Sequence, residues 1–143
     1  MEAQLLEFAT RHLFLVAGFA GVTILLLWSL LGAGLGGVQA LVPQQAALLI
    51  NHEDAVILDV REDSEYTQGH ILNAIHIPLG ALSGKIDKLN KYRDRPIIAS
   101  CMTGSRSSSA CSTLKKNGFE NLYNLKGGVM AWQNANLPLV KGK

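Results

Sequence analysis

The chain has 143 residues, 48% of them hydrophobic, and its 13 Lys and Arg residues against 11 Asp and Glu give a formal net charge of +2. This length allows one compact domain and a short further segment, and so small and scattered an excess of positive charge argues against a nucleic-acid partner. Two cysteines are too few for a disulfide framework, and without a Cys-x-x-Cys pair or a His/Cys cluster we expect no metal and no cofactor.

The first distinct segment of the chain is a long uncharged stretch. No Asp, Glu, Lys or Arg occurs from Leu13 to Leu31. A helix of about 20 apolar residues crosses the core of a bilayer, and Trp28 fits a position at the membrane interface. The alternative is a cleaved signal peptide, but the residues before the stretch are not strongly basic and such peptides have a shorter apolar core. The expected division is a tail over 1–11, a transmembrane helix over 12–34, a linker over 35–41 and a soluble domain over 42–143.

The soluble part alternates short apolar strands with helices. Such alternation predicts an α/β domain in which helices cover both faces of a parallel sheet. Ligands of such sheets bind at the carboxyl ends of the strands. In chain order, the pattern predicts a helix over 42–51, a strand over 56–60, a short helix over 64–68, a strand over 74–77, a helix over 79–89, a strand over 96–100, a helix over 107–117, a strand over 122–125 and a helix over 129–136.

A cysteine follows the strand over 96–100 and precedes the helix over 107–117. Backbone N–H groups at a helix N-terminus lack partners within the helix and favour negative charge, so a thiol there is biased toward the nucleophilic thiolate. Gly104 allows an unusual backbone turn, and Arg106 supplies a cation for an oxyanion. The candidate site is this loop, with Cys101 as the nucleophile, followed by Met102, Thr103, Gly104, Ser105, Arg106 and Ser107.

The length of this loop separates two kinds of chemistry. A cysteine phosphatase wraps a tetrahedral phosphate with a loop that reads Cys-x5-Arg, whereas Cys101 and Arg106 give Cys-x4-Arg. The shorter cradle suits the terminal sulfur of a cysteine persulfide. A phosphatase or arsenate reductase is therefore the disfavoured alternative, and we expect no turnover of a phosphate ester or arsenate.

The same loop, Cys-x-x-Gly-x-Arg-Ser, resembles that of rhodanese domains, the sulfurtransferase family. The resemblance covers roughly residues 42–140 and includes several further motifs in the family's order. Asn73 departs from the pattern, where the family often has Gly, but Asn also tolerates left-handed backbone angles. The matching stretches are Val56-Ile57-Leu58-Asp59-Val60-Arg61, then Glu62, Glu65 and Tyr66, then Gly69-His70-Ile71, Ala74, Ile77 and Pro78, and finally Asn121 to Gly128 with Trp132.

The resemblance implies a rhodanese-like fold and a two-step sulfur transfer. The thiolate of Cys101 would take sulfane sulfur from a small donor, thiosulfate or a persulfide, and pass it to a thiol or protein acceptor. Loop N–H groups would stabilise the persulfide, and Arg106 would bind the donor or hold the loop in shape. Asp59 and Arg61 would lie near the loop. We expect a structural role for them rather than catalysis, with the carboxylate bonding backbone donors and the arginine pairing with an acid on a neighbouring turn.

The plan of tail, single span and one domain resembles the YibN-type membrane rhodaneses of bacteria. A binding or regulatory module that meets a membrane protein partner is therefore the second hypothesis. Arg11, the only basic residue near the span, would place the domain outside the cytoplasm by the positive-inside rule. A reduced thiol and the family resemblance favour the cytoplasm instead. We expect a single-pass protein of the inner (cell) membrane, in contact with the lipid bilayer, whose domain faces the cytoplasm.

Overall fold

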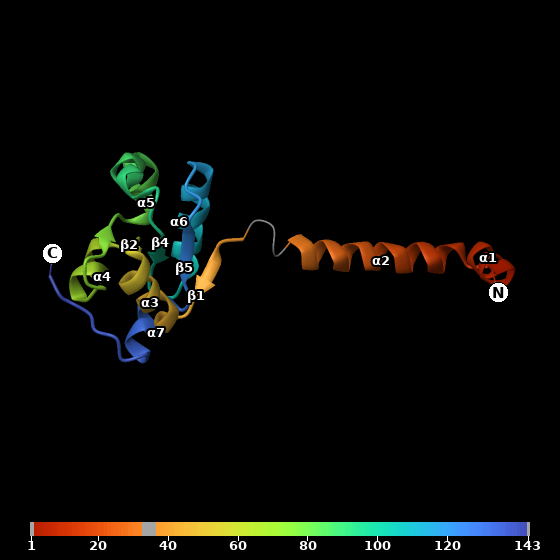
Figure 1. Ribbon diagram of the computed structural model, residues 1–143, viewed down its shortest axis with the longest axis horizontal. Helices are drawn as coiled ribbons and strands as arrows, with labels where there is room; N and C mark the ends of the chain where they lie inside the picture. Colours follow the sequence, from red (N-terminus) through yellow and green to blue (C-terminus); the bar gives the residue numbers. More distant parts are fainter. Residues whose placement is uncertain (1, 33–36, 143) are drawn as a thin grey trace. The chain divides into compact units, whose positions relative to one another are not determined.

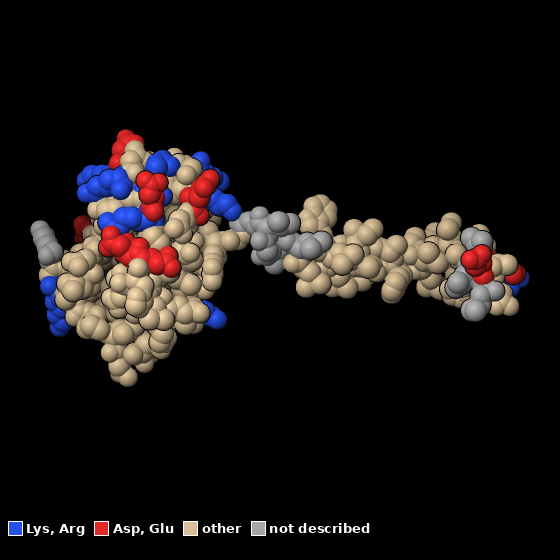
Figure 2. Space-filling view, in the orientation of Figure 1, with Lys and Arg blue, Asp and Glu red and all other residues tan. Residues whose placement is uncertain are grey.

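The computed structural model describes residues 2–32 and 37–142. These form two units, one up to Gly37 and one from Val38. The first unit contains helices α1 (Glu2–Arg11) and α2 (Leu13–Gly32). Within α2, residues Leu13–Leu30 are long and apolar enough to cross a membrane, with a mean hydropathy of 2.3, and Figure 2 shows the charged side chains outside this stretch. Residues 33 and 34 of the expected transmembrane helix, and residues 35 and 36 of the expected linker, lie outside the described residues.

The second unit is built on a five-stranded parallel sheet with the strand order β1-β5-β4-β2-β3. Every residue of β2 and β4 is buried, as expected for apolar strands covered on both faces. Because all the strands run the same way, their carboxyl ends share one edge of the sheet. The strands are β1 (Gln39–Leu41), β2 (Val56–Asp59), β3 (Ile75–His76), β4 (Ile97–Ser100) and β5 (Leu122–Leu125).

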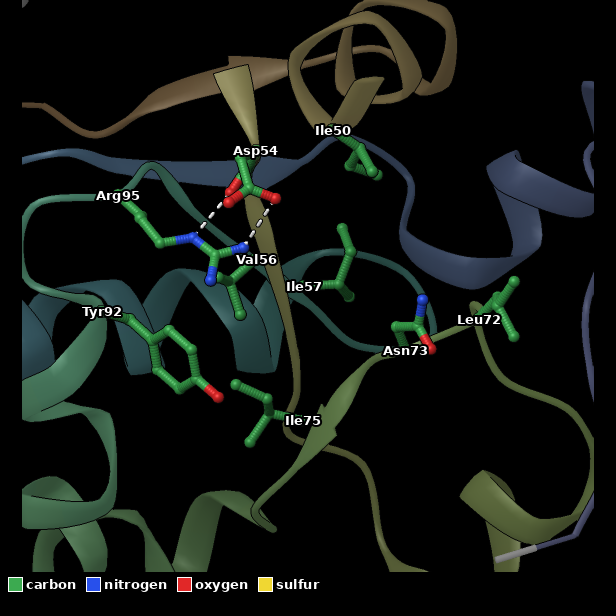
Figure 3. A pocket seen from close by; sticks show the side chains of 10 residues that line it. Ile50, Asp54, Val56, Ile57, Leu72, Asn73, Ile75, Tyr92 and Arg95 are labelled. Carbon is green, nitrogen blue, oxygen red and sulfur yellow. Dashed lines mark hydrogen bonds and ion pairs between the residues drawn. The ribbon is translucent and has the colours of Figure 1, made fainter. Parts of the chain in front are cut away.

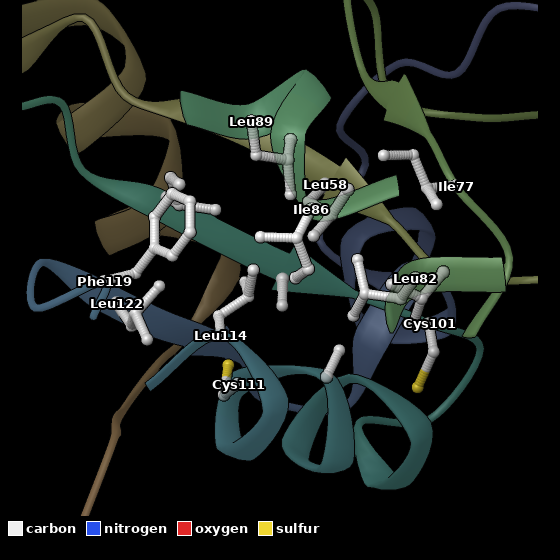
Figure 4. Close-up of a cluster of buried hydrophobic side chains, with 14 residues drawn as sticks. Leu58, Ile77, Leu82, Ile86, Leu89, Cys101, Cys111, Leu114, Phe119 and Leu122 are labelled. Atoms are coloured by element: carbon white, nitrogen blue, oxygen red, sulfur yellow. The ribbon is translucent and has the colours of Figure 1, made fainter. Parts of the chain in front are cut away.

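Helices cover both faces of this sheet, which confirms the expected α/β class (Figure 1). One apolar cluster joins the strands to α5, η1 and α6, and it includes both cysteines, whose thiols are free (Figure 4). A second cluster joins the other face to α3 and α7. The helices are α3 (Pro43–Glu53), α4 (Asp63–Gln68), α5 (Leu79–Leu82), the 3-10 helix η1 (Ser83–Tyr92), α6 (Ser105–Lys116) and α7 (Gly128–Asn134).

The sheet begins earlier in the chain than the sequence pattern indicates. Strand β1, Gln39–Leu41, lies within the stretch expected as a linker, and it pairs with β5 at the edge of the sheet. Leu41 is buried in the second cluster. A three-residue edge strand is held by backbone hydrogen bonds and one buried side chain, so it leaves no periodic signal in the sequence.

The helix expected over 79–89 is divided in the structure. Residues Leu79–Leu82 form α5, and a 3-10 helix follows, with Lys85 outside helical geometry at φ −123° and ψ 15°. Glycines at positions 80 and 84 weaken an α-helix here, each by roughly 1 kcal/mol relative to Ala. The apolar positions expected on one face are still buried: Leu82, Ile86 and Leu89.

Candidate active site

The loop that carries Cys101 joins the carboxyl end of β4 to the start of α6. Helix α6 begins at Ser105, two residues earlier than expected, so the last three residues of the candidate loop form its first turn. Gly104 precedes the helix at φ +105°, a left-handed conformation that favours glycine. The tight turn brings the N-terminus of α6 to Cys101. The Asn73 turn is also left-handed, at φ 61°, as the sequence predicts.

Backbone and side-chain donors converge on the sulfur of Cys101. The N–H of Gly104 donates to Sγ at 3.1 Å, and the hydroxyl of Ser107 lies 3.4 Å from it. Burial raises the pKa of the Cys101 thiol, but hydrogen bonds from Ser107, Gly104 and Thr103 outweigh it, so the pKa lies below its ordinary value. The residue itself is fully buried.

The other cysteine has the opposite environment. Cys111 is buried inside α6, as the sequence predicts, and its thiol donates to the carbonyl of Tyr123 at 3.4 Å. Burial raises the pKa of Cys111 to about 11. This thiol stays protonated at neutral pH and is a poor nucleophile, so the two cysteines differ in reactivity because of their surroundings.

A half-buried asparagine, which the sequence pattern does not mark as a site residue, completes the cradle. Ser107 donates its hydroxyl to Oδ1 of Asn124 at 2.6 Å, and Nδ2 of Asn124 donates to the carbonyl of Gly104 at 3.1 Å. Asn124 lies on β5, beside β4, at the carboxyl edge of the sheet. The sequence signal that could have found this position is a polar residue in an otherwise apolar strand.

Arg106 is held by a carboxylate from another part of the chain. Its two terminal nitrogens donate to the two carboxylate oxygens of Glu65, each at 2.7 Å, and this bidentate pair ties α6 to α4. The hydrogen bonds from Arg106 lower the pKa of Glu65 to about 2 from an ordinary value of 4.5. The stabilisation that follows is complete above about pH 4.5 and is lost as the pH falls toward 2. This pairing favours the expectation that Arg106 holds the loop in shape over the expectation that it binds the donor.

Asp59 and Arg61 form a second ion pair next to the first. Nη2 of Arg61 lies 2.7 Å from Oδ2 of Asp59, and the two side chains are 2% and 1% exposed. The guanidinium also donates to the carbonyls of Gly69, at 2.8 Å, and Glu65, at 3.3 Å. Arg61 thus holds the backbone of Glu65, whose carboxylate binds Arg106. The hydrogen bonds of the Arg61 guanidinium go to Asp59 and to the backbone of Glu65 and Gly69, which agrees with the structural role expected for the two residues.

The start of α7 closes the loop from the opposite side. The N–H of Val129 donates to the carbonyl of Cys101 at 2.8 Å, and the N–H of Met130 donates to that of Met102 at 3.2 Å. Gly128 lies so close that a Cβ there would overlap the carbonyl oxygen of Cys101. No residue with a Cβ fits at this position. This explains why the residue after Gly127 is also a glycine.

Two hollows of similar volume lie at different ends of strand β2. One, of about 160 Å³, lies beside the loop and is bordered by Met102 and Glu65. The other, of about 190 Å³, lies at the amino end of β2, where Asp54 and Arg95 form an ion pair of 3.0 Å (Figure 3). Only the first is next to the cysteine loop, so it is the candidate for the bound donor or acceptor.

Replacing Ser107 by Ala is expected to shift the pH dependence of sulfur loading on Cys101 to higher pH. The hydroxyl of Ser107 is the largest of the contributions that lower the pKa of Cys101, and without it a smaller fraction of the sulfur is thiolate at neutral pH. The measurement is the rate of loading against pH. Ser108→Ala, at an exposed neighbouring position, is the control that should leave the profile in place. An unchanged profile for Ser107→Ala would contradict this role.

Comparison with known proteins agrees with this geometry. The rhodanese-like domain model matches residues 42–135. The uncharacterized protein YibN of Escherichia coli is 30% identical over 98% of this chain and 99% of its own length, and a sulfurtransferase of Allochromatium vinosum is 34% identical over 64% of this chain and 84% of its own. The crystal structure of a rhodanese-related protein from Thermoplasma volcanium superposes with a TM-score of 0.66 at 30% identity, over 73% of this chain and 99% of the other. The chain belongs to the rhodanese-like domain family, and its sulfurtransferase relative supports a general role in sulfur transfer.

Proposed function

We propose that this protein is a sulfurtransferase that carries sulfane sulfur as a persulfide on Cys101, with thiosulfate as the simplest donor and a thiol or protein as the acceptor. The observation that carries the proposal is the convergence of the Gly104 N–H and the Ser107 hydroxyl on Sγ of Cys101 at the start of α6. These donors favour the thiolate and then stabilise the charge of the persulfide formed from it.

The reaction divides into two displacements. The thiolate of Cys101 attacks the outer sulfur of thiosulfate, a new S–S bond forms, and the old S–S bond breaks with its electron pair leaving on sulfite. An acceptor such as cyanide, or a thiolate in the cell, then attacks the terminal sulfur and regenerates the thiolate of Cys101. The Cys-x4-Arg loop, too short to wrap phosphate, supports this choice over phosphoryl transfer.

The proposal is tested by loading the full chain, in detergent, with thiosulfate and locating the added sulfur by peptide mass spectrometry. We expect one sulfur atom on the peptide that contains Cys101, released as thiocyanate when cyanide is added. The Cys111→Ala variant should load equally well, because its thiol is buried and protonated. A folded protein that takes up no sulfur from thiosulfate or from an organic persulfide would overturn the proposal.

We further propose that α2 anchors the protein in the inner membrane with its domain in the cytoplasm. The apolar stretch Leu13–Leu30 supports the anchor, and the need for a reduced thiol supports the cytoplasmic side. Because both native thiols are buried, the test uses a Lys88→Cys variant in the Cys111→Ala background. An impermeant thiol reagent should label position 88 only after lysis. Labelling of intact spheroplasts would place the domain outside.

The same apolar helix favours a second candidate function, a tethered module that docks to a membrane protein partner. The two candidates make opposite predictions for a phenotype that cells show when this protein is missing and that the wild-type protein restores. Loss of the phenotype in Cys101→Ser would favour sulfur transfer. Its retention in Cys101→Ser, together with its loss when α2 is replaced by an unrelated transmembrane helix, would favour the partner role.

A further inference from the structure

Arg106 in the active loop and Arg61 beside it are each neutralised by a carboxylate. Arg106 makes two hydrogen bonds of 2.7 Å to Glu65, and Arg61 is bound to Asp59 at 2.7 Å. The formal charge of these four side chains is zero. Within the described parts of the loop and α4, a sulfur donor that approaches Cys101 therefore meets no uncompensated guanidinium.

The hollow beside the loop also presents no unpaired positive charge among its described lining residues. Its volume is about 160 Å³, and among the described residues that line it Arg61, buried and paired, is the only basic one. The amides of Gln68 and Gln133 and the apolar side chains of Met102 and Leu139 provide much of its surface. Neutral hydrogen-bonding groups and apolar atoms suit the organic part of a thiol compound better than a small dianion.

The thiosulfate ion is poorly matched to these surroundings. It carries two negative charges toward a Cys101 thiolate, and the carboxylate of Glu65 cancels the attraction that Arg106 would otherwise exert. Because Cys101 is fully buried, water screens the repulsion between its thiolate and a like charge only in part. A donor that brings less negative charge to the sulfur escapes most of this repulsion.

Building on the proposed sulfur transfer, we infer that the physiological donor is an organic persulfide, R–S–SH, rather than thiosulfate, and that Glu65 sets this preference by occupying Arg106. In the step, the thiolate of Cys101 attacks the outer sulfur and forms a new S–S bond. The S–S bond of the donor breaks, and its electron pair leaves on the thiolate R–S⁻. The proton stays on the transferred sulfur, so Cys101 ends as the persulfide and no oxidant is needed.

The test compares two donors that differ in charge, using the full chain in detergent. Methanethiosulfonate has a methyl group where thiosulfate has a charged oxygen, so it carries one negative charge instead of two. We measure the second-order rate of sulfur loading on Cys101 with each, and with N-acetylcysteamine persulfide. The wild type should load slowest with thiosulfate. In Glu65→Gln, which frees the charge of Arg106, the ratio of thiosulfate to methanethiosulfonate loading should rise about tenfold.

Two further variants keep the test decisive. Asp63→Asn removes the same charge from α4 without touching the Arg106 pair, because its side chain is 89% exposed, and it should leave the ratio within about twofold. The double variant Glu65→Gln/Arg106→Gln covers the case in which Glu65→Gln does not fold. It removes both charges of a neutral pair, so the ratio of thiosulfate to methanethiosulfonate loading should stay within about twofold of the wild type, whereas a selective loss with thiosulfate would overturn the inference.

The outcomes separate this inference from the proposed function. If no donor places sulfur on Cys101, the proposed function fails. If Cys101 loads, but the wild type prefers thiosulfate or Glu65→Gln leaves the ratio unchanged, the proposed function stands and the persulfide preference is wrong.

Discussion

Replacement of Cys101 by Ser is expected to abolish sulfur transfer, with turnover in the thiosulfate:cyanide assay falling by about a thousandfold or more. A hydroxyl at this position is far too weakly acidic to be ionised by the donors that act on the thiol, and it does not form a stable sulfur adduct. The serine hydroxyl can still accept the hydrogen bond from the N–H of Gly104, so we expect the fold to persist. Thiocyanate formation and thermal unfolding of the same preparation measure the two effects.

Cys111→Ala is the matched control, because it removes the other thiol of the same cluster. Its turnover should stay within about twofold of the wild type, while its stability falls slightly because a buried side chain is lost. Turnover of Cys101→Ser above the rate without protein would show that another group carries the sulfur. Equal losses in the two variants would show that the assay reports unfolding rather than chemistry.

The fold was predictable where the sequence is locally consistent. Buried parallel strands such as Ile97–Ser100 are short apolar stretches with turn residues around them, and the structure places β4 within one residue of the expected range. Strand β5, Leu122–Leu125, has the predicted bounds. The edge strand β1 and the division between α5 and η1 were not predictable, because backbone pairing and a kink near Gly84 leave no hydrophobic period.

The candidate site was predictable to a similar degree. Cys101 and its loop follow from one rule, that a strand ending before a helix presents free N–H groups. The partners of the loop do not follow, because they come from distant positions: Glu65 binds Arg106 across 41 residues and Asn124 binds Ser107 across 17. A sequence shows that such residues are polar, but only the folded chain shows which charge each one meets. For this reason the sequence left two roles open for Arg106, binding the donor or holding the loop, and only the fold shows its pairing with Glu65.

Replacement of Arg61 by Met is expected to destabilise the domain by about 3–5 kcal/mol, because it leaves the buried carboxylate of Asp59 without its partner. At about 4 °C or more per kcal/mol for a domain of this size, the melting temperature should fall by more than about 10 °C. Methionine fills much of the space left by the arginine, so the loss reports the stranded charge and the freed carbonyls of Gly69 and Glu65 rather than a cavity.

Arg95→Met provides the control, since Arg95 forms an ion pair of 3.0 Å with Asp54 whose side chains are 37% and 83% exposed. Exposed pairs contribute about 0–1 kcal/mol, so its melting temperature should change little. In the double variant Asp59→Asn/Arg61→Met, the buried charge is gone and the asparagine can still accept from the N–H of residue 61, so more than about 1 kcal/mol should return. Equal losses for Arg61→Met and Arg95→Met would contradict the argument. The double variant would still lack the link from Arg61 to the backbone of Glu65, so we expect its stability to recover further than its rate of sulfur loading.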